Sequence, residues 1–373
     1  MKRSVLRVLL LLALGVVLGV FACGGDGFDP ASKVDSVRLF VVRADKPYAK
    51  PGDTVTLEAL FTDARRERPR AAKLYWIPIL CVNPREDLYY LCFAPPGDGG
   101  QQAGGTTLVP IGPLADAGAA GGDAGAASAG AGAAAGGAAA GGATPFGSIP
   151  AGVDLAAFLP QGPTFSFRMP DDVVTPRKGS PPYGLAIVFN ILCAGRVELA
   201  TRDSAGGVQQ VPLVCTDENG EKLPPSDYVI GISRVYAWPD RVNTNPVIEA
   251  LTFEGKDVVA ADGVTIERCT AERERDCKEN KIGVRVTDSS WEDNPSEVEP
   301  DGPLHEQIWV DWYSDQGSFD SAARLLFETR LGRVSDTDVS FRAPKATSDG
   351  TIWAVVHDNR GGSAWITVPL HVR

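Results

Sequence analysis

Apolar and polar residues alternate along this chain over short stretches, and no segment carries a long apolar repeat with the 3.6-residue period of a helix. In the stretch 54–61, for example, Val55, Leu57 and Ala59 alternate with Thr and Glu. A period of two is typical of strands with one buried face. Strands are therefore expected over residues 37–42, 54–61, 74–77, 164–167, 185–192, 208–214, 228–238, 247–253, 282–286, 308–313, 339–341, 351–356 and 364–372.

The expected strands fall into two series that look like copies of each other. Trp76 in the strand 74–77 is matched by Trp312 in the strand 308–313. The segment 166–170 (Ser-Phe-Arg-Met-Pro) is matched by 340–344 (Ser-Phe-Arg-Ala-Pro), and a long apolar strand follows each proline. Short strands with turn residues between them favour β-sandwiches. The sequence thus predicts an all-β protein built from two such units.

This order of strands resembles the bacterial immunoglobulin-like and PKD-like sandwich domains. The Asp-Phe-Gly-Asp-Gly type of signature of PKD domains is missing, so the resemblance implies Ig-like domains. It implies two tandem antiparallel β-sandwiches, over residues 37–240 and 241–373, with Trp312 as a core tryptophan. As a whole, the chain resembles myxobacterial-type bacterial lipoproteins of unknown function that carry such domains.

The first copy is much longer than the second between its tryptophan and its proline-ended strand. The extra residues form an insertion at about 97–148, which contains a Gly/Ala tract from Ala115 to Ala143. The tract has almost no charge, no aromatic residue and no period, so it cannot bury enough surface to offset its ordering entropy. We expect a disordered loop. A poly-Ala helix is the alternative, which the interspersed glycines disfavour.

The N-terminal stretch predicts export. Lys2, Arg3 and Arg7 precede an unbroken apolar run over 8–22, and Cys23 follows Ala22. A short apolar segment with a cationic start is typical of a signal peptide. The pattern resembles the lipobox of bacterial lipoproteins, which implies a signal peptide over 1–22, lipidation at Cys23 and a polar tether over 23–36. The alternative is an ordinary signal peptide with a coincidental cysteine.

The cysteine count agrees with an oxidising compartment. Without Cys23 six cysteines remain, and an even number suits disulfides. Fifteen pairings are open, and we favour neighbours in sequence because each pair lies beside a loop between expected strands. Zinc spacing is absent. The expected pairs are Cys81 with Cys92, Cys193 with Cys215, and Cys269 with Cys277.

The formal net charge of −11 makes nucleic acid an unexpected partner, because an acidic protein repels phosphate. We find no metalloprotease helix motif, nucleophile elbow or P-loop. One acidic loop, 288–297, offers Asp288, Glu292 and Asp293 as oxygen ligands for Ca²⁺. Its spacing matches no defined calcium loop, so a solvated acidic loop is the favoured interpretation and no cofactor is otherwise expected.

Strand parity predicts an aromatic binding face on the second domain. If Trp312 points inward, its strand neighbours point outward, because side chains alternate between the faces of a strand. Applied to three strands, this rule predicts one exposed surface, and exposed aromatic patches often bind partners. The other interpretation is that the first domain or the 269–277 loop covers the patch, and it is the favoured one because interdomain packing is the commoner use of such a face. The predicted face consists of Trp309, Tyr313, Trp353, His357 and Trp365.

These features together predict a lipid-anchored cell-envelope protein, held to a membrane by its N-terminal lipid. It would bind or scaffold an envelope protein or glycan through Ig-like domains and would not act as an enzyme. Two alternatives stay open. One is a carbohydrate-active enzyme, which a buried carboxylate pair in a cleft would support, and the other is a passive spacer.

Overall fold

The computed structural model describes residues 30–93, 107–111, 152–178, 180–200, 213–299 and 302–373. They form an all-β protein with several sheets, and this described part contains no α-helix. None of its helices is long and apolar enough to cross a membrane. Its helical turns are the short 3₁₀ segments η1 (Arg85–Asp87), η2 (Tyr89–Phe93), η3 (Leu155–Ala157), η4 (Glu274–Asp276) and η5 (Asp288–Ser290).

The first half of the chain begins with a three-stranded antiparallel sheet in the order β1-β3-β6. Leu57 and Phe167 on this sheet are buried, as the alternation predicts. The turn before β3 uses Gly52 at a φ of 81°, a conformation that favours glycine. The strands are β1 (Val37–Ala44), β3 (Thr54–Asp63) and β6 (Thr164–Arg168).

A larger sheet in the order β2-β11-β8-β4-β5 forms the rest of this half, with β7 (Thr175–Arg177) paired to β8 off that path. Strand β2 runs parallel to β11, and the other pairings are antiparallel. The strands are β2 (Tyr48–Ala49), β4 (Lys73–Val82), β5 (Thr107–Pro110), β8 (Ser180–Cys193) and β11 (Tyr228–Ala237).

Both faces of the middle strands β4 and β8 are covered. On the inner face, Trp76 belongs to a core shared with the three-stranded sheet, and its ring centroid lies 5.4 Å from that of Phe165. On the other face, Phe189 packs beneath an outer layer formed by η2, η3, β9 (Arg196–Leu199) and β10 (Leu213–Thr216). Double coverage explains why β8 is apolar over 185–192 almost without alternation.

The second half holds a five-stranded sheet, β13-β12-β15-β22-β19, and a six-stranded sheet, β14-β24-β23-β18-β20-β21. A separate hairpin joins β16 (Asp293–Glu299) to β17 (Gly302–His305). The first sheet contains β12 (Ile248–Phe253), β13 (Lys256–Asp257), β15 (Glu279–Val286), β19 (Ser318–Phe319) and β22 (Val339–Arg342). The second contains β14 (Val264–Ile266), β18 (Ile308–Ser314), β20 (Ala323–Glu328), β21 (Gly332–Arg333), β23 (Ser348–Asp358) and β24 (Ser363–Val372).

One hydrophobic core lies between these two sheets, and the predicted parity is confirmed there. Trp312 is fully buried in it, with its strand neighbour Val310. Ile352, Ala354 and Val356 of β23 also face this core. The two halves share a further feature, since a short strand runs parallel to the last strand in each: β2 beside β11, and β14 beside β24.

The structure corrects two expectations about loops. The end of the expected tether is paired, because the Val34 amide donates to the Ser314 carbonyl and the Ser314 amide to that of Ser32, both at 2.9 Å. Ser32 and Val34 are buried. Within the expected insertion, β5 pairs with β4. Residues 1–29 with Cys23, and the Gly/Ala tract 115–143, lie outside the described residues.

Candidate functional site

The structure brings the five predicted aromatic-face residues together on one sheet. Tyr313 of β18 is the register partner of Trp353 on β23, and Trp309 is the partner of His357. On β24, Trp365 lies opposite Val355. The rings of Trp309 and His357 stack with centroids 5.3 Å apart.

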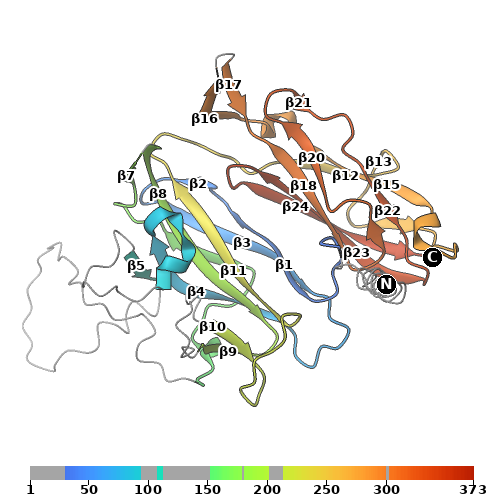
Figure 1. Cartoon of the computed structure of the whole chain (residues 1–373), viewed down its shortest axis with the longest axis horizontal. Coiled ribbons are helices and arrows are strands. Elements are labelled where there is room, and N and C mark those ends of the chain that lie inside the picture. Colours follow the sequence, from blue (N-terminus) through green and yellow to red (C-terminus); the bar gives the residue numbers. More distant parts are fainter. Residues whose placement is uncertain (1–29, 94–106, 112–151, 179, 201–212, 300–301) are drawn as a thin grey trace, which may run out of the picture.

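This face is not free, and of the two interpretations left open the structure agrees with the covered patch. Trp353 is only 5% exposed, and the other four residues are half-buried. The Phe40 ring of β1 lies 4.8 Å from the Tyr313 ring and 4.9 Å from the Trp353 ring, between centroids. The Arg43 guanidinium lies 4.3 Å from the Trp365 ring centroid. The predicted face therefore packs against the first half of the chain. Figure 1 shows β1 beside the second half.

A β-bulge on β1 builds this contact. The pairing of β1 with β3 skips a residue between Leu39 and Val41, so Phe40 has no register partner. Before the bulge Leu39 faces the core of the first half, and after it Val42 does. Strict alternation would turn Arg43 toward that core, whereas the bulge leaves Phe40 and Arg43 on the side of the second half.

A buried ionic cluster lies at the turn between β23 and β24. Glu306 is fully buried, and its Oε1 accepts a 2.5 Å hydrogen bond from Arg360 Nε. Arg360 Nη2 also donates to Glu292 Oε2 at 2.8 Å. Asp358, 3% exposed, accepts from the amides of Arg360 and Gly362 at 2.7 and 2.8 Å. Two carboxylates thus engage a single guanidinium, and a third, Asp358, accepts from the backbone of the same turn, which holds the turn closed.

Glu306 has the most unfavourable position in the cluster. Its Oε2 is buried without a hydrogen-bond partner in the described part. Burial raises the pKa of Glu306 to about 8, and the negative charge of Asp358 adds to the rise. Burial also raises the pKa of Asp358 above its ordinary value. An acid in such a site keeps its proton at neutral pH, because ionisation would leave an unsolvated charge.

The cluster also ties the two halves together. The Asn245 side chain donates to the Ala44 carbonyl of β1 at 2.8 Å and accepts from the Ser363 amide at 2.9 Å. Asn243 donates to Asp358 Oδ2 at 3.3 Å. The Arg360 guanidinium lies 5.6 Å from the Tyr48 ring centroid of β2. The segment between β11 and β12 is therefore held against both halves.

The candidate calcium ligands do not converge. Asp288 accepts from Arg333 at 2.6 Å, Glu292 faces Arg360, and Asp293 lies 3.1 Å from His305 Nδ1. Across the described ranges, no group of three His, Cys, Asp or Glu side chains could hold a metal ion. Each carboxylate is instead engaged by a basic side chain, which favours the structural interpretation of this loop.

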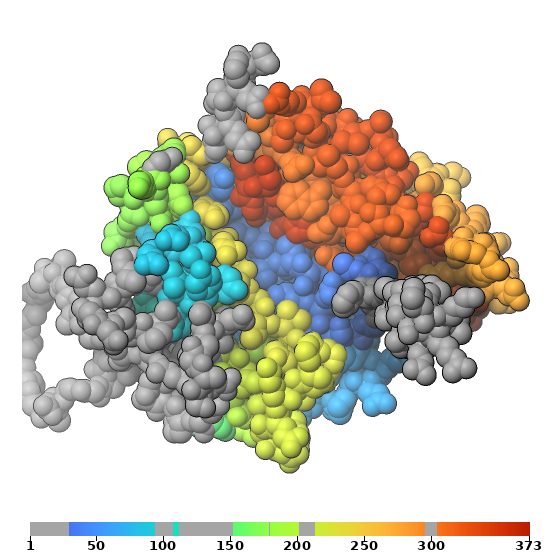
Figure 2. Space-filling view, viewed as in Figure 1, coloured from blue at the N-terminus to red at the C-terminus, as the bar shows by residue number. Residues whose placement is uncertain are grey.

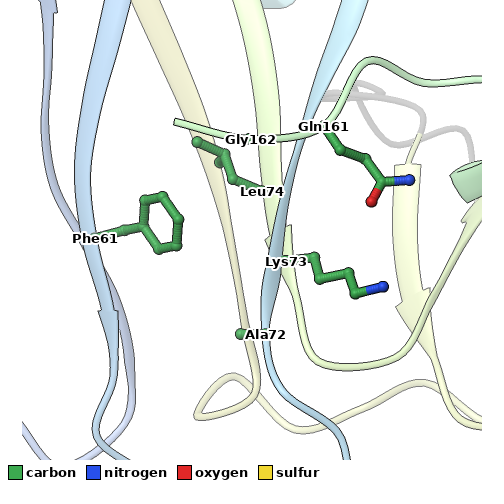
Figure 3. A pocket seen from close by; sticks show the side chains of 6 residues that line it. All are labelled: Phe61, Ala72, Lys73, Leu74, Gln161 and Gly162. Carbon is green, nitrogen blue, oxygen red and sulfur yellow. The ribbon is translucent and has the colours of Figure 1, made fainter. Parts of the chain in front are cut away.

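A small pocket of about 280 Å³ opens at one end of the first half (Figure 3). Phe61, Ala72 and Leu74 give it an apolar side, and Lys73, Gln161 and Gly162 complete the lining. Figure 3 shows the Phe61 ring pointing toward Leu74, with the polar ends of Lys73 and Gln161 on the opposite side. Its described lining includes no carboxylate and no residue of the ionic cluster.

The three disulfides join the expected neighbours in sequence. Their Cα–Cα distances are 5.7 Å for Cys81–Cys92, 5.8 Å for Cys193–Cys215 and 5.3 Å for Cys269–Cys277. The first two tie the outer layer to β4 and β8. Disulfides persist in oxidising compartments, so these three indicate an extracytoplasmic protein.

Comparison with known proteins adds little. No protein-family model matches the chain, and no curated protein matches it. Among solved structures, the dimeric latent PorU from Porphyromonas gingivalis is similar over 91% of this chain and 24% of that one, at 11% identity and a TM-score of 0.18. The chain spans about a quarter of that structure's length. A likeness this weak carries no argument about fold or function.

Proposed function

We propose that the protein is a lipid-anchored cell-envelope protein that binds or scaffolds partners through two tandem Ig-like β-sandwiches, without catalysis. The sheet topology supports the Ig-like assignment. In each half, two sheets enclose a core that contains a tryptophan. In one sheet of each half, a short strand also runs parallel to that half's last strand, β11 or β24. Two sheets of short strands packed over a core with a buried tryptophan are typical of the immunoglobulin fold.

The junction between the halves carries the functional part of the proposal. Phe40, the Arg43–Trp365 contact and the Asn245 bridge fix the two units in one arrangement. A fixed pair of sandwiches suits the presentation of surfaces at a set distance from a membrane.

Catalysis is less well supported. A glycoside hydrolase needs two carboxyl groups that face a cleft. Glu306 and Asp358 are a buried pair, but Arg360 engages Oε1 of Glu306, and Asn243 and backbone amides engage Asp358. A carbohydrate-active enzyme would therefore need a site elsewhere.

The test uses the full chain expressed in a bacterium with its lipoprotein pathway. Mass spectrometry of the mature N-terminus is expected to find acylated Cys23, and Cys23→Ser is expected to release the protein from the membrane fraction. Crosslinking in intact cells is then expected to capture envelope components. An unacylated N-terminus would refute the anchor, and a chain that crosslinks to nothing would leave the spacer as the better account.

A further inference from the structure

The outer side of β11 carries a half-buried apolar stripe at the margin of the larger first-half sheet. Tyr228, Ile230, Ile232 and Tyr236 alternate along this strand, so they share one face. They pack at the edge of the core beneath the outer layer and are half-buried, whereas Phe189 on neighbouring β8 is fully buried. Figure 2 shows yellow atoms of this region at the surface, in a hollow between the cyan segment and the blue strands. The outer layer thus covers β4 and β8 more completely than β11.

Two cations that form no ion pair within the described part of the chain accompany the stripe. Arg234 lies on the same face of β11, is exposed, and has its guanidinium 5.8 Å from the Tyr89 ring centroid. Lys222 is exposed, with its ammonium 5.9 Å from the Tyr228 ring centroid. Neither has a carboxylate within ion-pairing distance among the described residues. Nearby Arg177 does, because it pairs with Asp87 at 3.4 Å. The chain as a whole has a net charge of −11, whereas these two cations place positive charge beside one apolar stripe.

We infer that this β11 surface, formed by Tyr228, Ile230, Ile232, Arg234 and Tyr236 with Lys222, binds an extended acidic peptide segment of a partner protein. The inference rests on the proposed binding function and assigns it a site and a partner chemistry. Carboxylates of the segment pair with Arg234 and Lys222, and its aliphatic side chains cover Ile230 and Ile232. An exposed arginine fork suits a carboxylate because it can donate two parallel hydrogen bonds.

The dimensions fit a short segment. Residues 228 and 234 are six positions apart on one strand, which is ~20 Å at about 3.4 Å per residue. An extended peptide of about seven residues spans that length. Its two acidic groups would lie near its ends and its apolar residues between them.

A glycan fits this surface less well than a peptide. Sugar hydroxyl groups need hydrogen-bond partners when they leave water. The middle of the stripe consists of Ile230 and Ile232, which offer none. The Tyr236 ring is tilted by 59° against Tyr183, with centroids 5.8 Å apart, and does not lie open as a flat platform.

The experiment pans a phage-displayed library of random twelve-residue peptides on the full chain, with Arg234→Glu protein as the counter-selection. Enriched peptides are expected to carry Asp or Glu flanking aliphatic residues. Their dissociation constants, measured by calorimetry, are expected to rise at least tenfold in Arg234→Glu, and in the same direction in Lys222→Glu. Arg273→Glu is the matched control, because Arg273 is exposed in the loop between β14 and β15 of the second half, and it is expected to change nothing.

Melting temperatures of the variants confirm that each folds. The inference fails if no peptide is enriched over the counter-selection, if the enriched peptides lack acidic residues, or if Arg273→Glu weakens binding equally. A glycan array bound by the wild type but not by Arg234→Glu, without peptide enrichment, would assign the surface to a sugar and overturn the peptide. If Arg234→Glu protein is still acylated at Cys23 and still crosslinks to envelope components, the proposed function holds but does not use this site.

Discussion

At the scale of single residues, the burial of Glu306 is energetically unfavourable. Folding removes its carboxyl group from water and gives hydrogen bonds to only one of its oxygens. An unpaired buried polar atom destabilises the folded state. Two effects reduce the cost of burying this carboxyl group. It accepts a hydrogen bond from Arg360, and in its protonated form it avoids most of the desolvation cost of a charge.

The position of Glu306 predicts a pH-dependent stability. Its folded pKa of about 8 lies above the ordinary value of 4.5, so the folded state holds a proton that the unfolded state releases between these values. Its contribution to stability is therefore largest below pH 4.5 and is lost as the pH rises to about 8. Asp358 titrates in the same direction.

Glu306→Gln removes this titration and keeps the shape of the side chain. We expect the melting temperature of the variant, relative to wild type, to increase from pH 5.5 to pH 8.5. Differential scanning fluorimetry across that range measures it. Glu67→Gln, at an exposed loop position, is the control and is expected to show a flat difference. A flat difference for Glu306→Gln as well would show that the carboxyl ionises normally.

A substitution of Phe40 tests the contact that the β1 bulge makes with the second half. Replacing it by alanine removes a ring that lies between Tyr313 and Trp353, and the loss of a half-buried aromatic contact is expected to cost about 2 kcal/mol of unfolding free energy. Urea denaturation measures this change. Phe158→Ala deletes a ring that is 64% exposed and is expected to cost less than about 0.5 kcal/mol. Equal losses would mean that Phe40 makes no productive contact.

At the scale of elements, the period of two predicted the strands that alternate over five or more residues. Strands β3, β11, β18 and β24 lie where the period of two placed them. Two-residue strands such as β2 and β19 were not predicted, because so short a stretch has no period. The outer layer over β4 and β8 was missed for a related reason. Its segments are 3₁₀ turns and short strands fixed by tertiary contacts and disulfides.

The disulfides close loops of different length, which predicts a ranking of their contributions to the free energy of unfolding. The Cys193–Cys215 bridge closes a separation of 22 residues, and Cys269–Cys277 closes one of 8. Loop-closure entropy makes the longer bridge more stabilising by about 1 kcal/mol. Urea denaturation of the two double Cys→Ala variants measures the difference. A larger loss from Cys269→Ala/Cys277→Ala would show that strain or residual structure outweighs chain entropy.

At the scale of the whole molecule, parity predicted which aromatic residues gather but not what covers them. The rule concerns one strand and its two faces, and it placed Trp309, Tyr313 and Trp353 side by side. Strand β1, which covers them, lies more than 250 positions away in the chain. A β-bulge in β1 turns the Phe40 side chain toward them. The ionic cluster was likewise not predictable from the sequence, because Glu306, Arg360 and Asn243 become neighbours only through the fold.

This junction predicts that the two halves unfold together. Phe40 and Trp353 join them through buried aromatic surface, and the Asn245 bridge adds two hydrogen bonds. Such coupling makes the unfolding of one half expose apolar surface of the other, so calorimetry of the wild type is expected to show one transition. In Phe40→Ala/Trp353→Ala the coupling is lost, and two transitions are expected.

A control separates this effect from general damage. The pair Phe158→Ala/Leu331→Ala removes side chains that are 64% and 88% exposed, and it is expected to keep the single transition. X-ray scattering supplies the second readout, since a loosened junction increases the radius of gyration of the folded protein while a merely destabilised core does not. Two transitions in the wild type would mean that the halves are independent domains in contact. A single transition in the junction variant would mean that the ionic cluster alone suffices to couple them.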